Sequence, residues 1–123
     1  MANTVTPFVY NAILERVVDG DTVDIDIDLG FGIWLRNERV RVLGIDAPET
    51  RTRDLAEKEK GLESKAFVEG MLPVGSKQVL ISKGFNGKFG RILGTFKFYD
   101  GLKDRWTDLS TIMIERGYAE VYN

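Results

Sequence analysis

The sequence has 123 residues, a formal net charge of −2 at pH 7, 43% hydrophobic residues and 29% charged residues. This length and composition predict one ordinary globular domain over residues 1–123, and no apolar run approaches the roughly 20 residues that cross a bilayer. The near-neutral charge argues against a protein that coats nucleic acid through a strongly basic surface, but it leaves room for a local basic site.

Cysteine and histidine are both absent. Their absence excludes disulfide bonds, thiolate zinc sites, histidine-ligated metals and nucleophiles activated by imidazole. Any catalysis near neutral pH must therefore use carboxylates, lysine, tyrosine or water held by a cation. The segment from Met1 to Tyr10 shows no secretory signal, which favours a cytoplasmic protein, or one encoded by a phage or mobile element, over a secreted one. We also expect a monomer.

Three strands are predicted in the first third of the chain. Phe8 to Val18 is rich in β-branched and aromatic residues and runs into a turn at Asp19 to Asp21, which indicates a hairpin. Thr22 to Asp28 alternates apolar and acidic residues, which predicts a half-buried strand with an acidic outer face. Ile33 to Leu43 is predicted as a third strand, interrupted near Asn37.

A polar, loop-like stretch from Asp46 to Lys60 precedes a predicted short helix between Gly61 and Pro73. Helical spacing is expected to turn three side chains of this helix toward a core: Leu62, Phe67 and Met71.

The last third of the chain is predicted to hold two strands, Lys77 to Ser82 and Arg91 to Tyr99, and a second helix. Thr107 or Asp108 would cap this helix, which would end at Arg116 with Gly117 as its C-cap. The order predicts a mainly β α+β fold, a five-stranded OB-fold barrel with a helix between strands three and four and another after strand five. Another α+β roll is the alternative.

The stretch from Arg39 to Thr50 carries the strongest chemical signal. Its strand ends at a turn around Pro48, where Asp46 and Glu49 place two carboxylates near the strand arginines. Oxygen ligands held beside a fixed arginine can bind a hard cation next to an anionic substrate. The alternative is a solvated turn after a strand.

Three segments together resemble, in order and spacing, motifs of the staphylococcal nuclease family: Asp19-Gly20-Asp21-Thr22, Arg41 to Thr50, and Gly87-Lys88-Phe89-Gly90-Arg91. The resemblance covers about Ile13 to Tyr122. It implies a Ca²⁺-dependent endonuclease that hydrolyses DNA and RNA with little sequence preference and leaves 3′-phosphates. The chain stops at Asn123, before the family's usual third helix, which would make it a short form with a weaker grip on substrate.

The resemblance also implies which residues bind the metal. Asp21 and Asp46 would be Ca²⁺ ligands through their carboxylates, and Ala47 would add its backbone carbonyl. Threonine is common in the family where this chain has Ala47, but the side chain is not the ligand, so the change should cost little.

The remaining site residues follow from the same resemblance. Glu49 would be the general base, Arg41 and Arg91 would grip the phosphate, and Lys88 and Phe89 would contact the substrate. Phe89 stands where tyrosine is common, so a hydroxyl that could bond to a phosphate is missing. Lys88 could also lie in a merely exposed turn.

Several residues have a simpler interpretation. Asp19 could be a structural turn residue, and Arg39 is taken as solvated. The acidic series Asp24, Asp26 and Asp28 mimics the start of a helix-loop-helix calcium loop, but its alternation with apolar residues indicates a strand.

At the level of function, the alternatives are a non-catalytic OB-type module that binds nucleic acid or protein, and an acidic adaptor without a nucleic-acid role. A pure binding module has no reason to keep all five of the metal-binding and catalytic side chains Asp21, Arg41, Asp46, Glu49 and Arg91.

Overall fold

The computed structural model of the chain describes residues 8–86 and 90–122. The elements follow in the order β1 (Phe8–Asp19), β2 (Thr22–Gly30), β3 (Ile33–Val42), β4 (Ile45–Asp46), α1 (Leu55–Met71), β5 (Lys77–Asn86), β6 (Arg91–Asp100), β7 (Arg105–Asp108), α2 (Leu109–Glu115) and β8 (Glu120–Val121). Within these described ranges, no helix is long and apolar enough to span a bilayer.

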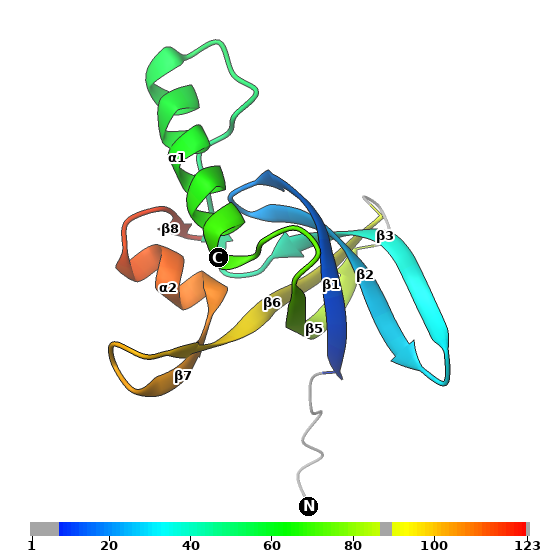
Figure 1. Cartoon of the computed structure of the whole chain (residues 1–123). Coiled ribbons are helices and arrows are strands. Elements are labelled where there is room, and N and C mark those ends of the chain that lie inside the picture. The colour runs from blue at the N-terminus through cyan, green and yellow to red at the C-terminus, as the bar shows by residue number, and fades with distance from the viewer. Residues whose placement is uncertain (1–7, 87–89, 123) are drawn as a thin grey trace, which may run out of the picture.

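Five strands pair in a ring. The sheet order is β3-β2-β1-β5-β6-β7. β3 also pairs in parallel with β6, through Val40 and Ile92, so β3, β2, β1, β5 and β6 form a closed ring of paired strands. Figure 1 shows these strands curving around one another, with both helices on the same side. The predicted mainly β α+β fold of OB type, with its two helices in the predicted places in the order, is confirmed.

The core lies inside the ring and continues under the helices. Alternate residues of the strands point inward, as the period of two requires, and Leu14, Ile25, Val40 and Phe96 are fully buried. Leu109 and Met113 of α2 and Val68 of α1 extend the same apolar cluster. This packing holds both helices against the strands that carry the candidate site.

Helix α1 begins earlier than the sequence predicted. Asp54 caps it by accepting hydrogen bonds from the N–H groups of Ala56 (3.0 Å) and Glu57 (3.2 Å), so the loop predicted through Lys60 is wrong for residues 55–60. This first part of α1 projects beyond the strands in Figure 1 and is exposed throughout, which explains why it has no apolar periodicity.

The buried face of α1 also differs from the prediction. Its buried residues are Gly61, Ser64 and Val68, whereas Leu62 is 50% exposed. Small residues face inward because the helix approaches the backbone after β4 closely: a Cβ on Gly61 would lie 2.7 Å from the carbonyl carbon of Glu49. The prediction for Leu62 is therefore wrong, while Phe67 and Met71 do pack against the core.

The acidic face of β2 is covered rather than solvated. Asp24 and Asp26 are each only 6% exposed, because arginines of β1 and β3 lie over them. β3 runs through Asn37 without a break, and the predicted interruption is only a local irregularity: the φ of Asn37 is 55°, and its N–H donates to Asp26 Oδ1 at 2.8 Å.

Helix α2 follows the predicted capping. Asp108 caps it by accepting from the Thr111 N–H at 2.8 Å, and Gly117 lies just beyond its end with a φ of 78°. The short strands β4, β7 and β8 were not predicted from the sequence. The pairing of β4 with β8 matters for the site, since it fixes Asp46 opposite Glu120.

Candidate active site

Asp21 is a buried carboxylate fixed by the turn between β1 and β2. Its Oδ2 accepts from the Ala47 N–H at 2.9 Å, and its Oδ1 accepts from the Thr22 hydroxyl at 2.9 Å. Its backbone carbonyl accepts from the Val42 N–H at 2.8 Å. The turn needs Gly20, because a Cβ there would lie 2.9 Å from the Cβ of Ala47. These contacts fix the carboxylate before any ligand binds.

Arg41 is held by the backbone of its own strand and of β4. Its Nη1 donates to the carbonyl oxygens of Val42 and Ile45, both at 2.9 Å, and its side chain is only 17% exposed. The guanidinium carbon lies 5.6 Å from the ring centroid of Tyr122, within the range of a cation–π contact. The guanidinium is therefore oriented by the fold and not by a substrate.

The two predicted metal ligands converge on this guanidinium. Nη2 of Arg41 lies 3.6 Å from Asp21 Oδ2 and 3.4 Å from Asp46 Oδ1, and the Asp46 side chain is 60% exposed. Ca²⁺ takes about six to eight oxygen ligands. Among the described residues no group of three acidic side chains could hold a metal, so this pair fits a cation as part of a shell that water or phosphate oxygens would complete.

Arg91 approaches from the neighbouring strand. It begins β6, one residue before Ile92, which pairs with Val40 of β3. It lines a pocket of about 490 Å³ together with five other residues, Val18, Asp19, Thr22, Arg39 and Arg51.

Glu49, the predicted base, is exposed in the loop after β4 and lines neither the Arg91 pocket nor the larger pocket beside α1. The structure thus brings Asp21, Arg41, Asp46 and Ala47 into contact, places Arg91 on the adjacent strand, and leaves Glu49 at the edge. The predicted substrate contacts Lys88 and Phe89 lie outside the described residues.

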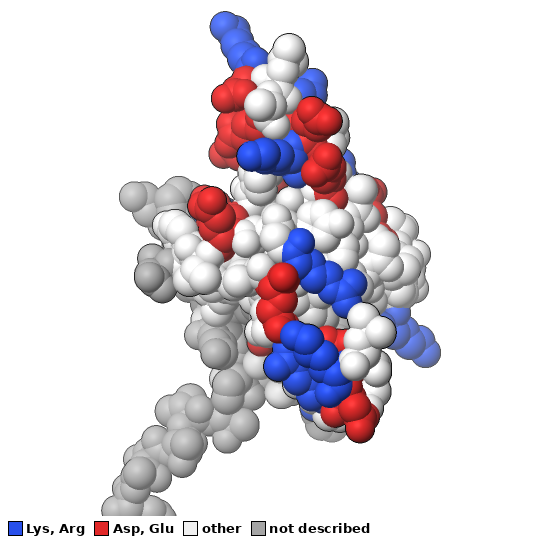
Figure 2. Space-filling model, turned by 90° about the vertical axis from the view of Figure 1, so that its left-hand side faces the viewer, with Lys and Arg blue, Asp and Glu red and all other residues white. Residues whose placement is uncertain are grey.

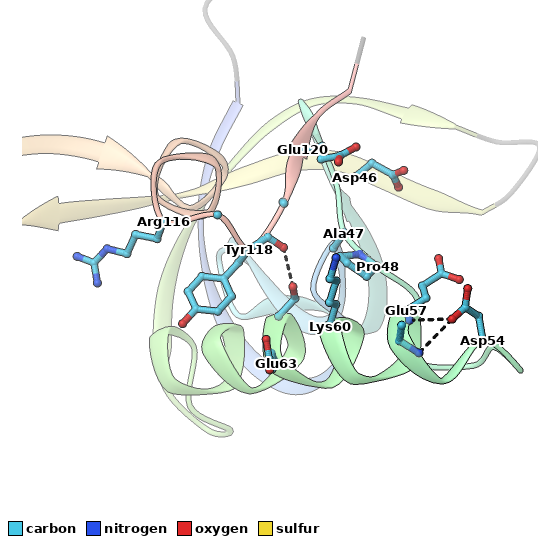
Figure 3. A pocket seen from close by; sticks show the side chains of 14 residues that line it. Asp46, Ala47, Pro48, Asp54, Glu57, Lys60, Glu63, Arg116, Tyr118 and Glu120 are labelled. Carbon is cyan, nitrogen blue, oxygen red and sulfur yellow. Dashed lines mark hydrogen bonds between the residues drawn. The ribbon is translucent and has the colours of Figure 1, made fainter.

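This larger pocket, of about 710 Å³, lies between α1 and the segment after α2. Figure 3 shows Asp46 and Glu120 at one end of it and Lys60 and Glu63 along α1. Ser64 closes its base by donating to the Tyr118 carbonyl at 2.6 Å. Acidic side chains outnumber basic ones among its lining residues, so this pocket suits a cation better than a phosphate.

Sequence reasoning missed two features of the site. Asp19 Oδ1 accepts from the Thr50 hydroxyl at 2.7 Å and links the β1–β2 turn to the loop after β4. Arg39 is exposed as predicted, with 43% of its side chain accessible, but it also holds Asp24 with two hydrogen bonds that the sequence did not indicate. Cross-strand register could have revealed this pair, since Arg39 lies opposite Asp24 on β2.

Charge is mixed on the face drawn in Figure 2. Figure 2 shows Lys and Arg interspersed with Asp and Glu over the projecting α1 at the top of the view, and the basic groups do not merge into one continuous patch on this face. On this face, contact with a polyanion would therefore depend on a local arrangement of basic groups.

Comparison with known proteins agrees with this geometry. Residues 39–123, more than half of the chain, match the family described as "Staphylococcal nuclease homologue". Endonuclease YhcR of Bacillus subtilis (strain 168) is 26% identical over 120 residues, which are 92% of this chain and 9% of that protein. Protein ParB of Escherichia coli is 30% identical over 110 residues, which are 87% of this chain and 54% of that protein.

The chain thus spans only part of the length of both relatives. The match over β3 to β8, together with the strand order, shows that the chain belongs to the staphylococcal nuclease family.

Proposed function

We propose that the chain is a monomeric, Ca²⁺-dependent phosphodiesterase that hydrolyses DNA and RNA with little sequence preference and leaves 3′-phosphates. The observation that carries the proposal is the convergence of Asp21 and Asp46 on Arg41, with Arg91 starting the strand paired to β3. Two carboxylates and two arginines, contributed by the β1–β2 turn, β3, β4 and β6, suit a charged phosphodiester better than a neutral ligand.

The arginines would stabilise the phosphate as its charge grows. A guanidinium offers planar paired donors to phosphate oxygens, and only donors placed where charge develops in the transition state accelerate the step. The carbonyl contacts of Arg41 support this role, because a donor that is already oriented needs no reorganisation during the reaction.

Asp21, Asp46 and the backbone carbonyl of Ala47 would hold the Ca²⁺. When bound, the ion supplies Lewis-acid polarisation of the phosphoryl oxygens and neutralises part of their charge. With two carboxylates and one carbonyl the shell is incomplete, so substrate oxygens would strengthen Ca²⁺ binding and Ca²⁺ would strengthen substrate binding.

Glu49 would accept the proton of the attacking water. The chain has no histidine, so a carboxylate is the side chain that could act as a base without a large pKa change. Its exposed position after β4 leaves it accessible to water and substrate.

A calcium titration of nuclease activity on single-stranded DNA tests the proposal. We expect cleavage that requires Ca²⁺, stops with a chelator and rises on the alkaline side, where hydroxide equivalents are more abundant. The matched control is Asp26→Asn, a buried acidic residue away from the site, which should keep its calcium dependence. A non-catalytic binding module, the competing function, predicts binding of the same DNA without cleavage at any calcium concentration.

A further inference from the structure

The pocket that contains Arg91 has a chemistry different from that of the carboxylate pair. Three arginines and one aspartate line it, Arg39, Arg51, Arg91 and Asp19, in a chain whose net charge is −2. At about 490 Å³ it is large enough for one phosphodiester group and its sugar. Nothing in the proposed reaction uses Arg39 or Arg51.

The pocket shares Arg91 with the candidate active site, and the strand register places Arg39 next to it. Because Val40 pairs in parallel with Ile92, the residues one position earlier, Arg39 and Arg91, are neighbours across β3 and β6. Arg39 and Arg41 lie on the same face of β3, two residues apart, which is about 6.6 Å along a strand. Neighbouring phosphates of an extended single strand can reach both arginines.

Arg39 is oriented before any ligand binds. Its Nε donates to Asp24 Oδ1 at 2.9 Å and its Nη2 donates to Asp24 Oδ2 at 3.2 Å. These bonds use two of the five N–H donors of the guanidinium and leave others for a ligand. Arg16 also pairs with Asp24 Oδ2 at 3.3 Å. Two arginines therefore share one carboxylate, and the cluster of Arg16, Arg39 and Asp24 keeps a net positive charge.

The loop that carries Arg51 is tied to the same pocket. Asp19 accepts from both the hydroxyl (2.7 Å) and the N–H (3.4 Å) of Thr50, the residue just before Arg51. Asp19 itself lines the pocket. This link fixes the start of the loop after β4 and keeps the exposed Arg51 at the pocket rim.

We propose that this pocket is a second phosphate subsite, in which Arg39 and Arg51 hold a backbone phosphate of the polynucleotide next to the phosphate that is cleaved. The inference rests on the proposed nuclease function and specifies its substrate as a chain with at least two phosphodiesters. The contacts go to phosphate and not to base edges, so the subsite raises affinity without adding sequence preference.

The test compares two substrates with parent and variant proteins. The thymidine dinucleotide carries only the phosphodiester that is cleaved, whereas the thymidine tetranucleotide carries additional ones on either side. We expect Arg39→Gln and Arg51→Gln each to lower kcat/KM about tenfold on the tetranucleotide, mainly through KM, and to change it little on the dinucleotide. The salt dependence of tetranucleotide binding should also weaken.

Arg36→Gln is the matched control. It removes an arginine of the same strand that pairs with a buried aspartate, Asp26, at 3.1 Å, but it does not line the pocket. We expect it to leave the ratio of the two kcat/KM values unchanged.

Equal losses on both substrates, or no loss on either, would overturn the subsite. Arg51→Gln decides the matter if Arg39→Gln disturbs folding through Asp24. Failure of the proposed function has a different signature: the parent then cleaves neither substrate. In that case, the affinity of the tetranucleotide, measured by fluorescence, would test the subsite. An approximately tenfold weaker affinity of Arg51→Gln supports it, and an unchanged affinity overturns it.

Discussion

The Asp21 carboxylate accepts a hydrogen bond from the backbone N–H of Ala47 at 2.9 Å, which ties the β1–β2 turn to the segment after β4. Asp21 is therefore a structural acceptor as well as a proposed metal ligand. Asp46, the second proposed ligand, differs from it, because its side chain is 60% exposed and contacts Arg41 at the edge of the hydrogen-bond range.

The two aspartates should respond differently to the same substitution. We expect Asp21→Asn to lower the free energy of unfolding by about 1–3 kcal/mol in the presence of a chelator, because a buried charge-assisted acceptor is lost. Asp46→Asn should change it by less than about 0.5 kcal/mol, as is typical of an exposed position. Urea unfolding of both variants measures the difference.

Ligand protection separates the metal role from the structural role of these residues. Calcium with a nucleoside bisphosphate should raise the melting temperature of the parent, and this increase should be lost in both Asp21→Asn and Asp46→Asn. Asp26→Asn is the control and should keep the increase. A similar loss in all three variants would contradict a site at Asp21 and Asp46.

Replacement of Arg41 by lysine should lower activity although the positive charge is kept. Arg41→Lys and Arg91→Lys each remove a planar pair of donors, and we expect kcat to fall by about 10²–10³ in both. Arg41→Lys should also lower the melting temperature, because one ammonium cannot keep both carbonyl contacts to Val42 and Ile45. Thermal unfolding with steady-state kinetics checks both effects. A fully active Arg41→Lys would contradict the proposed grip on phosphate.

The lowered pKa of Asp26 should make the stability of the protein depend on pH. The Asn37 N–H, above all, lowers the pKa of Asp26 from its ordinary 3.8, with a smaller effect from Arg36. A lowered folded-state pKa stabilises the protein above the unfolded pKa, and this contribution is lost as the pH falls through the folded pKa. Glu15 contributes with the opposite sign, because its hydrogen bond to Asp26 raises the pKa of Glu15.

Thermal unfolding of the parent and Asp26→Asn from neutral pH to below pH 3.8 tests this dependence. The stability difference between them should be largest at neutral pH and should shrink in acid. A difference that is constant over the whole range would mean that packing, and not charge, accounts for the loss.

Elements with a simple period were predicted best from the sequence. The alternation of apolar residues located the long strands. The assignments of Asp21, Arg41 and Asp46 came instead from the resemblance to the staphylococcal nuclease motifs. The pairing of Arg39 with Asp24 was missed because it depends on register, and the irregularity around Asn37 shifts that register between β2 and β3.

The start of α1 was missed for a different reason. Its first turns project from the strands, so they carry no apolar face for a periodicity argument to find. A capping signal was nevertheless present, since Asp54 is followed three residues later by Glu57. The inward face of α1 was misassigned because glycine and serine, and not the larger Leu62, meet the neighbouring backbone.

Glu49→Gln separates an enzyme from a binding module. The substitution keeps the size of the side chain and removes its charge, so binding of a nucleotide with calcium should stay near normal while cleavage falls by orders of magnitude. Fluorescence binding and a cleavage assay measure the two properties on one preparation. If the parent cleaves and Glu49→Gln cleaves nearly as fast, Glu49 is a turn residue and another group accepts the proton.

Two glycines of α1, Gly61 and Gly70, should respond in opposite ways to replacement by alanine. Alanine in place of glycine inside a helix normally stabilises by about 1 kcal/mol, and Gly70→Ala should do so, because no atom lies within 4 Å of its added Cβ. Gly61→Ala should destabilise instead, since its Cβ would overlap the carbonyl group of Glu49 and approach that of Pro48 to 2.9 Å.

This steric conflict also reaches the proposed catalytic loop. Relief of the overlap must move either α1 or the loop that carries Glu49, so Gly61→Ala should lower kcat as well as stability, whereas Gly70→Ala should leave kcat unchanged. Urea unfolding and single-turnover cleavage of both variants check the pair. If Gly61→Ala unfolds more easily than the parent but cleaves at the parent rate, the contact between α1 and the loop supports the fold alone, and the position of Glu49 does not limit catalysis.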